Sequence, residues 1–468
     1  MRKRTLLLAA TLTTGLLTTL TLPATTAAAA PSGLSDDFNG DGYRDLAVGD
    51  GGATVAGKKQ AGAIVVIWGT ATGLAPAKRT VVSQNTPYVA GAAETNDHFG
   101  TDITTVDLNK DGYGDIIATA PGEDAGAYNG TFTVLWGSKS GLTSGSSYRN
   151  PKHKDRGFAS DIAVGDFNAD GKQDVVAVDD TNIWYLRGPF TKSGSRGTAT
   201  DFDPVDGENI DPVLVVSGKV TKDGTADFAV LGRDWDTDSD RVWFYKGGSG
   251  GPKKTKKVTL PASAALTEAS ATIADFDKNG YGDLVVGSRR AGKGGAVHVL
   301  PGTSNGPSGS AKKFTQATSG VPGTPESADY FGSDVSAADT NADGYPDLAV
   351  GVSGEVIGDN WFRMGGVTVL RGGTSGLTGK NSRMYDYATA GVEGEPGEEN
   401  DAWFGDSVLL RDYTRDGRAE LVAASSQNGR LHILPGSASG PTGTGSKMLT
   451  LTSLGLQSLT KFWAELAD

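Results

Sequence analysis

The chain has 468 residues, 68 of them glycine and none cysteine, and its formal net charge at pH 7 is −12. This length allows a large hydrophobic core, while the lack of cysteine excludes disulfide bonds as a source of stability. The acidic balance argues against nucleic acid as a partner. The short basic run at residues 253–257 is interpreted as a solvated turn.

Residues 1–30 have the pattern of a secretory signal peptide. Three cations, Arg2, Lys3 and Arg4, precede an apolar stretch, and alanines at 27–29 offer a small-residue cleavage site. The sequence therefore predicts a secreted, extracellular product. No later stretch is apolar and long enough to span a membrane, and we expect a monomer.

Residues 31–468 are predicted to form one domain built on a nine-residue repeat, DxNxDGxxD. Five complete copies begin at Asp37, Asp107, Asp166, Asp275 and Asp339. Two further copies, at residues 219–227 and 412–420, are degenerate and partial, respectively. Position 12 of the complete copies is valine or alanine instead of the glutamate of an EF-hand, and an apolar run follows. Each loop is therefore expected to join two β-strands.

Oxygen ligands at positions 1, 3, 5 and 9, with the backbone carbonyl at position 7, suit a calcium ion. Asx-rich turns without a metal are the alternative, and five copies favour the metal. We therefore expect about five structural calcium sites. The predicted ligands are Asp37, Asn39, Asp41, Tyr43, Asp45, Asp107, Asn109, Asp111, Tyr113, Asp115, Asp166, Asn168, Asp170, Lys172, Asp174, Asp275, Asp277, Asn279, Tyr281, Asp283, Asp339, Asn341, Asp343, Tyr345 and Asp347. The partial loop adds Asp412, Asp416 and Glu420, whose occupancy the sequence leaves open.

The strands between the loops predict an all-β fold. Each unit continues with a third strand that ends in a glycine turn, such as AIVVIWG or TFTVLWG, and a weaker fourth strand, such as residues 79–83 or 312–315. Four strands in roughly 60 residues, repeated seven times, are typical of a seven-bladed β-propeller. The first unit lacks its opening strand, and residues 461–468, with Phe462-Trp463 in the opening position, are predicted to supply it and close the ring.

Aromatic-glycine pairs open several units: Phe99-Gly100, Phe331-Gly332 and Phe404-Gly405. Together with the DxNxDGxxD loops and Ala120-Pro121-Gly122, they resemble the FG-GAP repeats of the integrin α-subunit headpiece and of bacterial secreted FG-GAP/VCBS-type proteins. The resemblance implies a calcium-binding propeller used for adhesion and ligand binding. The fourth loop, with Lys219 and Thr221 in its first two ligand positions, departs from the pattern and is expected to bind no metal.

A ligand is expected on the face opposite the calcium loops, where the longer connections emerge. Those connections carry aromatic residues beside acidic residues, a combination that suits a glycan or a basic protein surface. The alternative for each ring is that it only pins its own loop. The candidates are Tyr88, Tyr128, Tyr330, Trp361 and Trp403.

The sequence thus favours a secreted, calcium-binding module for a glycan or protein ligand that is not an enzyme. The chain has four histidines, and its two GxSxG matches lie in glycine-rich turns with no helix after them, so neither is a nucleophile elbow. The alternative is an extracellular calcium-dependent polysaccharide lyase or hydrolase with acids on the loop face, such as Glu395 with Asp359.

Overall fold

The computed structural model describes residues 31–468 apart from residues 125–128, 152–156, 203–209, 262, 263, 265, 267, 359–361, 395–400, 457–463 and 468. The predicted signal peptide therefore lies outside the described residues. Residues Pro31–Asp468 form a single compact unit. Among the described residues, no helix combines the length and apolar character needed to cross a membrane.

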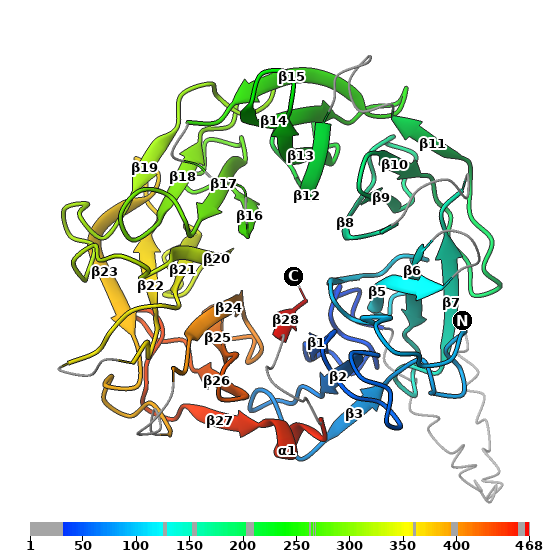
Figure 1. Ribbon diagram of the computed structural model, residues 1–468, viewed down its shortest axis with the longest axis horizontal. Coiled ribbons are helices and arrows are strands. Elements are labelled where there is room, and N and C mark those ends of the chain that lie inside the picture. Colours follow the sequence, from blue (N-terminus) through cyan, green and yellow to red (C-terminus); the bar gives the residue numbers. More distant parts are fainter. Residues whose placement is uncertain are drawn as a thin grey trace, which may run out of the picture. The chain divides into compact units, whose positions relative to one another are not determined.

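Seven four-stranded antiparallel sheets form the blades of a β-propeller (Figure 1), which confirms the predicted fold. Blades 1 to 3 contain β28 (Ala464–Leu466), β1 (Leu46–Asp50), β2 (Ala63–Ile67) and β3 (Arg79–Val82); β4 (Ile103–Val106), β5 (Asp115–Asp124), β6 (Asn129–Trp136) and β7 (Ser144–Arg149); and β8 (Asp161–Gly165), β9 (Asp174–Val178), β10 (Ile183–Leu186) and β11 (Ala199–Phe202).

Blades 4 and 5 contain β12 (Ile210–Gly218), β13 (Asp227–Asp234), β14 (Ser239–Lys246) and β15 (Lys253–Thr259); and β16 (Ala269–Ala274), β17 (Asp283–Ser288), β18 (Ala296–Leu300) and β19 (Lys312–Phe314). Blades 6 and 7 contain β20 (Phe331–Ala338), β21 (Asp347–Val352), β22 (Gly366–Arg371) and β23 (Thr378–Tyr385); and β24 (Phe404–Arg411), β25 (Glu420–Ser425), β26 (Arg430–Leu434) and β27 (Lys447–Thr450). The short helix α1 (Leu451–Leu454) follows β27.

The basic run at residues 253–257 is not the solvated turn that the sequence suggested. It begins β15, which pairs with β14 and forms the outer strand of blade 4. The cause is tertiary: Val258 of the same strand is buried in the apolar cluster between blades 4 and 5. That packing anchors the segment as a strand although lysine itself has little preference for one.

The C-terminal strand closes the ring, as predicted. Strand β28 pairs antiparallel with β1, with Val48 opposite Leu466 and Asp50 opposite Ala464. Leu466 also lies in the apolar cluster that joins blade 1 to blade 7 through Leu409 and Val422. Phe462-Trp463, the predicted opening pair of this strand, lies outside the described residues. Blade 1 is therefore assembled from both ends of the domain.

The second and third strands of the blades read as continuous apolar runs because neighbouring blades cover both of their faces. Every residue of β1 (LAVGD) and β2 (AIVVI) is buried, and the same holds for β17 and β18. His298 of β18 is 1% exposed, and burial lowers its pKa to about 4. Its position in the core and its lowered pKa keep this histidine neutral at pH 7.

The Phe-Gly pairs mark the entry into the innermost strands. Phe99, Phe331 and Phe404 are fully buried between blades. The glycines that follow them have left-handed backbones, with φ of 82°, 89° and 83°, a region that residues with a Cβ rarely occupy. In blade 3 the variant Phe158-Ala159 keeps this conformation, with φ of 60° at Ala159.

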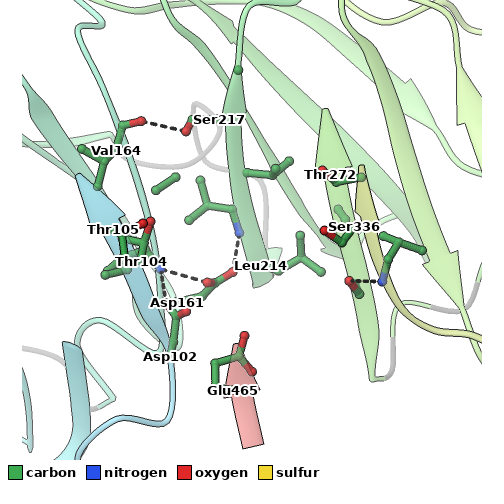
Figure 2. Close-up of a pocket in the computed structure, with 18 of the residues that line it drawn as sticks. Asp102, Thr104, Thr105, Asp161, Val164, Leu214, Ser217, Thr272, Ser336 and Glu465 are labelled. Carbon is green, nitrogen blue, oxygen red and sulfur yellow. Dashed lines mark hydrogen bonds between the residues drawn. The ribbon is translucent and has the colours of Figure 1, made fainter. Parts of the chain in front are cut away.

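The innermost strands surround a polar central channel of about 1090 Å³ (Figure 2). Carboxylates near its wall tie several blades to their neighbours. Asp102 of blade 2 accepts the amide of Ile162 at 2.9 Å, and Asp161 of blade 3 accepts the amide of Val215 at 2.7 Å. These bonds fix the rotation of one blade against its neighbour, which sets the geometry of both faces.

Candidate metal loops and ligand pocket

The first five positions of each complete loop form a tight nest around backbone amides. In blade 1, Asp37 accepts the amides of Gly40 at 2.7 Å through Oδ1 and of Gly42 at 2.8 Å through Oδ2. Asn39 Oδ1 accepts the amide of Asp41 at 2.8 Å, and Asp41 Oδ1 accepts that of Tyr43 at 3.0 Å. Asx turns of this kind explain why Asp and Asn occupy positions 1, 3 and 5.

The same bonds recur around the ring. Positions 3 and 5 accept amides two residues later at 2.8 to 3.1 Å in blades 2, 3, 5 and 6. The partial loop of blade 7 keeps the bonds of Asp412 and Asp416. The loop fold is therefore encoded locally.

The acidic residue at position 9 behaves differently and forms what we call the loop clamp. One carboxylate oxygen of Asp45 accepts the amide of Phe38, at loop position 2, at 2.9 Å, and the other accepts the amide of Gly69, after the third strand, at 2.7 Å. Equivalent pairs of bonds occur in all seven blades, including the degenerate blade 4 and, through a glutamate, blade 7. Position 9 thus braces the fold whether or not a metal is bound.

The sequence analysis did not identify the two positions whose amides the clamp binds, loop position 2 and the glycine after the third strand, although each has a recognisable sequence pattern. Loop position 2 is 0 to 1% exposed in every blade, and its side chain is apolar or threonine: Phe38, Leu108, Phe167, Val220, Phe276, Thr340 and Tyr413. The glycine after the third strand is required sterically. A Cβ at Gly69 or Gly372 would lie 2.1 Å or 2.0 Å from a backbone carbonyl oxygen at loop position 8. In the sequence, this glycine can be recognised as the second residue of the WG, RG and PG pairs that recur at the end of the third strand.

The position-9 carboxylates differ in the number of hydrogen bonds that they accept from the protein. Asp45 and Asp115 each accept the two clamp amides, and burial, reinforced by the neighbouring loop carboxylates, raises the pKa of each to about 8. Asp174 accepts two further donors, Asn168 Nδ2 at 3.0 Å and Tyr185 Oη at 2.9 Å. Because a carboxylate has about four lone-pair positions, Asp174 is saturated by the protein while Asp45 and Asp115 are not.

Blade 6 also saturates its position-9 carboxylate. Arg371 NH1 lies 2.8 Å from Asp347 Oδ2, and Thr340 donates its hydroxyl to the same oxygen. This buried ion pair supplies positive charge from within the chain. The loops with a complete ligand set and spare lone pairs at position 9 are therefore those of blades 1, 2 and 5.

The donor chemistry of these loops fits a hard cation such as calcium, since several carboxylates and amide oxygens share a few ångströms of chain. As the side chains stand, however, no three carboxylates or imidazoles in the described part of the chain already converge as a metal site. Oxygens at positions 1, 3 and 5 instead cap backbone amides, each keeping a second lone pair. Asp37, Asn39 and Asp41, with their counterparts in blades 2 and 5, are the groups that would hold the ion.

In blade 4, whose loop lacks the first two ligands, two lysines beside the loop make polar contacts. Lys222 Nζ donates to the Asn279 carbonyl at 2.9 Å, and Lys246 Nζ lies 3.2 Å from Asp223. Asp223 at position 5 thus has a lysine partner, while Asp227 at position 9 forms the clamp.

On the opposite face, the structure brings together two of the five aromatic ligand candidates. Tyr330 and Trp403 have ring centroids 6.2 Å apart. Tyr88 instead packs against the core between blades 1 and 2. Tyr128 and Trp361 lie outside the described residues, as do Glu395 and Asp359 of the alternative acid pair.

Tyr330 and Trp403 border a pocket of about 350 Å³ at the mouth of the channel, which we call the channel-mouth pocket. Arg289, which the sequence analysis did not single out, places its guanidinium 4.4 Å from the Tyr330 ring centroid and 5.7 Å from that of Trp403. Its NH1 lies 3.7 Å from Asp406. Glu268, Gln427 and Glu465 are among the other polar residues that line it. Its size and mixed lining are typical of a small-ligand site.

Comparison with known proteins identifies the repeat to which these loops belong. The profile of the FG-GAP repeat matches residues 29–67, 99–135, 269–300 and 331–362, which correspond to blades 1, 2, 5 and 6. The chain contains FG-GAP repeats. Three of the four matched repeats are those in which the position-9 carboxylate keeps spare lone pairs. The FG-GAP resemblance seen in the sequence is thereby confirmed.

Relatives of this FG-GAP propeller fall into two groups. Integrin alpha-5 of Xenopus laevis is 28% identical over 265 residues, 52% of this chain and 24% of that protein, and integrin alpha-PS5 of Drosophila melanogaster is 31% identical over 147 residues, 30% and 14%. Phosphatidylinositol-glycan-specific phospholipase D of Rattus norvegicus is 30% identical over 168 residues, 35% and 18%. The matches thus span less than a quarter of each relative's length.

The second group corrects one prediction. The sequence analysis concluded that the chain is not an enzyme, and that conclusion is wrong, because proteins named as phosphatidylinositol-glycan-specific phospholipase D from rat and mouse are 30% and 29% identical to it over 35% of its length. The absence of a recognisable nucleophile motif was too weak a basis for it.

Proposed function

We propose that this protein is a secreted, calcium-braced FG-GAP propeller that binds a glycan or protein ligand at the channel-mouth pocket. The observation that carries the proposal is the convergence of Tyr330, Trp403 and Arg289 from three different blades on one pocket. Similarity to two integrin α subunits supports a role in binding.

The position of the pocket also supports this proposal. Its lining comes from connections between second and third strands and from segments leading into the innermost strands, which emerge at the end of the blades opposite the nine-residue loops. A ligand there would leave the metal loops free to act as braces. Rigid blades joined by inter-blade hydrogen bonds hold its aromatic and charged groups in place.

Calcium should stabilise the propeller. We expect the melting temperature to rise with calcium and to fall on addition of EGTA, because an ion bound to the folded state at 100 times its dissociation constant contributes about 2.7 kcal/mol per site. Asp41→Ala in blade 1 should reduce this response. Asp223→Ala in blade 4, whose loop lacks the first two ligands, is the matched control and should leave it unchanged. Equal melting temperatures in calcium and EGTA would refute the calcium proposal.

Ligand binding should depend on Trp403. Neutral polysaccharides such as xylan and mannan, and a basic protein such as lysozyme, serve as probes at 150 mM salt by size-exclusion chromatography. We expect Trp403→Ala to weaken binding of the retained probe at least about tenfold, in line with losses seen when a central aromatic anchor is truncated. Trp235→Ala is the control, because Trp235 is 52% exposed and also stacks on an arginine, Arg233 at 5.4 Å, but lies on blade 4 away from the pocket. Retention of no probe, or equal loss in both variants, would contradict the pocket assignment.

A catalytic role is the second candidate function, favoured by the similarity to phospholipases D. Glu268, Asp406 and Glu465 line the channel-mouth pocket and are the carboxylates that could take part. The incubations with polysaccharides also test for catalysis, which shortened polymer would establish. Release of the lipid from a phosphatidylinositol-glycan substrate would establish it as well. Asp406→Asn would then be the first variant to assay.

A further inference from the structure

The outer strands of blades 4, 5 and 6 carry an uneven share of positive charge. Of the eleven lysines and arginines on the seven outer strands, eight lie on β15, β19 and β23. These three strands contain no Asp or Glu. We call this set the basic rim: Lys253, Lys254, Lys256, Lys257, Lys312, Lys313, Lys380 and Arg383.

The basic rim is accessible and continuous. Seven of its eight residues are exposed, and Lys256 is half-buried. Figure 1 shows β15, β19 and β23 following one another along the periphery, from green to orange. Lys312 Nζ donates to the Leu377 carbonyl at 2.6 Å, which ties blade 5 to the turn before β23. The rim therefore spans the outer strands of three successive blades, on a chain whose net charge is −12, and Lys257 also lies 3.5 Å from Asp234.

Protection of sheet edges does not account for this distribution. Charged residues on edge strands discourage sheets from pairing with other chains, so every outer strand would need them. The outer strands β3, β7 and β27 have one basic residue each, and β11 has none, although Val81 of β3 is 41% exposed. Four of the seven outer strands thus carry at most one basic residue, and the concentration on three neighbouring blades requires another explanation.

We propose that the basic rim binds a linear anionic polysaccharide. Lysine is a compact point charge that attracts carboxylate or sulfate groups without demanding one geometry. Successive strand residues rise by about 3.3 Å, so the four lysines of β15 extend along roughly 13 Å, a span that several charged sugars would cover. The only aromatic residues on the three strands, Phe314 and Tyr385, are buried, so the rim offers no platform for stacking bases, which disfavours single-stranded nucleic acid.

This surface is separate from the channel-mouth pocket, which lies at the centre of the propeller. The two proposals therefore fail independently. Neutral polymers probe the pocket, while charged polymers at low salt probe the rim.

The test measures binding of heparin and polygalacturonate, a sulfated and a carboxylated polymer, at 50 to 300 mM salt. The rim variant replaces Lys253, Lys254, Lys256 and Lys257 by glutamine, and the matched control replaces the exposed Lys58, Lys59, Lys78 and Lys139 of blades 1 and 2, giving the same change in net charge. We expect both polymers to bind wild type and control, and the rim variant to bind at least about tenfold more weakly with a shallower salt dependence, since fewer counterions are released.

Four results would overturn the proposal: no polymer binding at 50 mM salt, equal loss in rim and control variants, binding of an oligothymidylate but of neither polysaccharide, or self-association of the rim variant with polymer binding unchanged. The last would show that the lysines only protect the sheet edge. A second variant, with Lys313, Lys380 and Arg383 replaced by glutamine, serves if the first does not fold.

Discussion

Replacing Asp227 by alanine should destabilise the propeller by about 2 to 6 kcal/mol, because it leaves two buried backbone amides without an acceptor at roughly 1 to 3 kcal/mol each. Asp227 is fully buried and accepts the amides of Thr221 at 2.7 Å and Gly247 at 2.9 Å. Blade 4 lacks the first two metal ligands, so the loss should be the same in calcium and in EGTA. Urea unfolding followed by circular dichroism measures it.

Asp223→Ala is the matched control in the same loop. Asp223 is exposed, and its contact with Lys246 is a surface ion pair, which contributes about 0 to 1 kcal/mol. Asp227→Asn should fall between the two, because its amide keeps one acceptor oxygen. If Asp227→Ala and Asp223→Ala unfold at the same urea concentration, position 9 is not a clamp.

Deleting residues 461–468 should lower the stability of the whole ring. The deletion removes β28, leaves β1 with an unpaired edge and exposes the cluster shared by blades 1 and 7. Loss of a buried leucine such as Leu466, which is 5% exposed, alone costs about 2 to 5 kcal/mol of stability. Loss of the three residue pairs between β28 and β1 adds to this cost. We expect a single transition at a clearly lower melting temperature, because blades 1 and 7 contact each other through this strand.

Point variants serve where the truncated chain is poorly expressed. Leu466→Ala should reproduce a large part of the loss, whereas Glu465→Ala, a lining residue of the channel in Figure 2, should unfold close to wild type. Coincident melting curves for the truncated and full-length chains would contradict ring closure by the C-terminus.

The correspondence between sequence and fold is close where information is local. The nine-residue loops encode their own nests of hydrogen bonds, since positions 1, 3 and 5 bond amides two to five residues away. Strand alternation and loop spacing then give the number of blades, and the absence of a strand before Asp37 predicts closure by the C-terminus. Repetition reinforced each of these inferences.

The sequence was a weaker guide to the structure of the basic run and to the environment of single side chains. The basic run at 253–257 was interpreted as a turn from its composition, but its neighbour Val258 packs between two blades and makes it a strand. Tyr88 was predicted as a ligand residue; its half-buried ring packs against the core between blades 1 and 2, and a role in ligand binding stays a prediction. Whether a side chain faces solvent, ligand or neighbour depends on the blade beside it, which no local pattern records.

By itself, the sequence determined that the chain contains FG-GAP repeats, with seven four-stranded blades, five complete loops and a ring closed by its C-terminal strand, because each of these follows from local patterns that repeat along the chain. Only the tertiary structure decided that Arg371 neutralises Asp347, that Arg289 joins Tyr330 and Trp403 from three blades, and that lysines of separate outer strands form one rim. Those groups are brought together by blade-to-blade packing, whose angles depend on side-chain contacts throughout the ring.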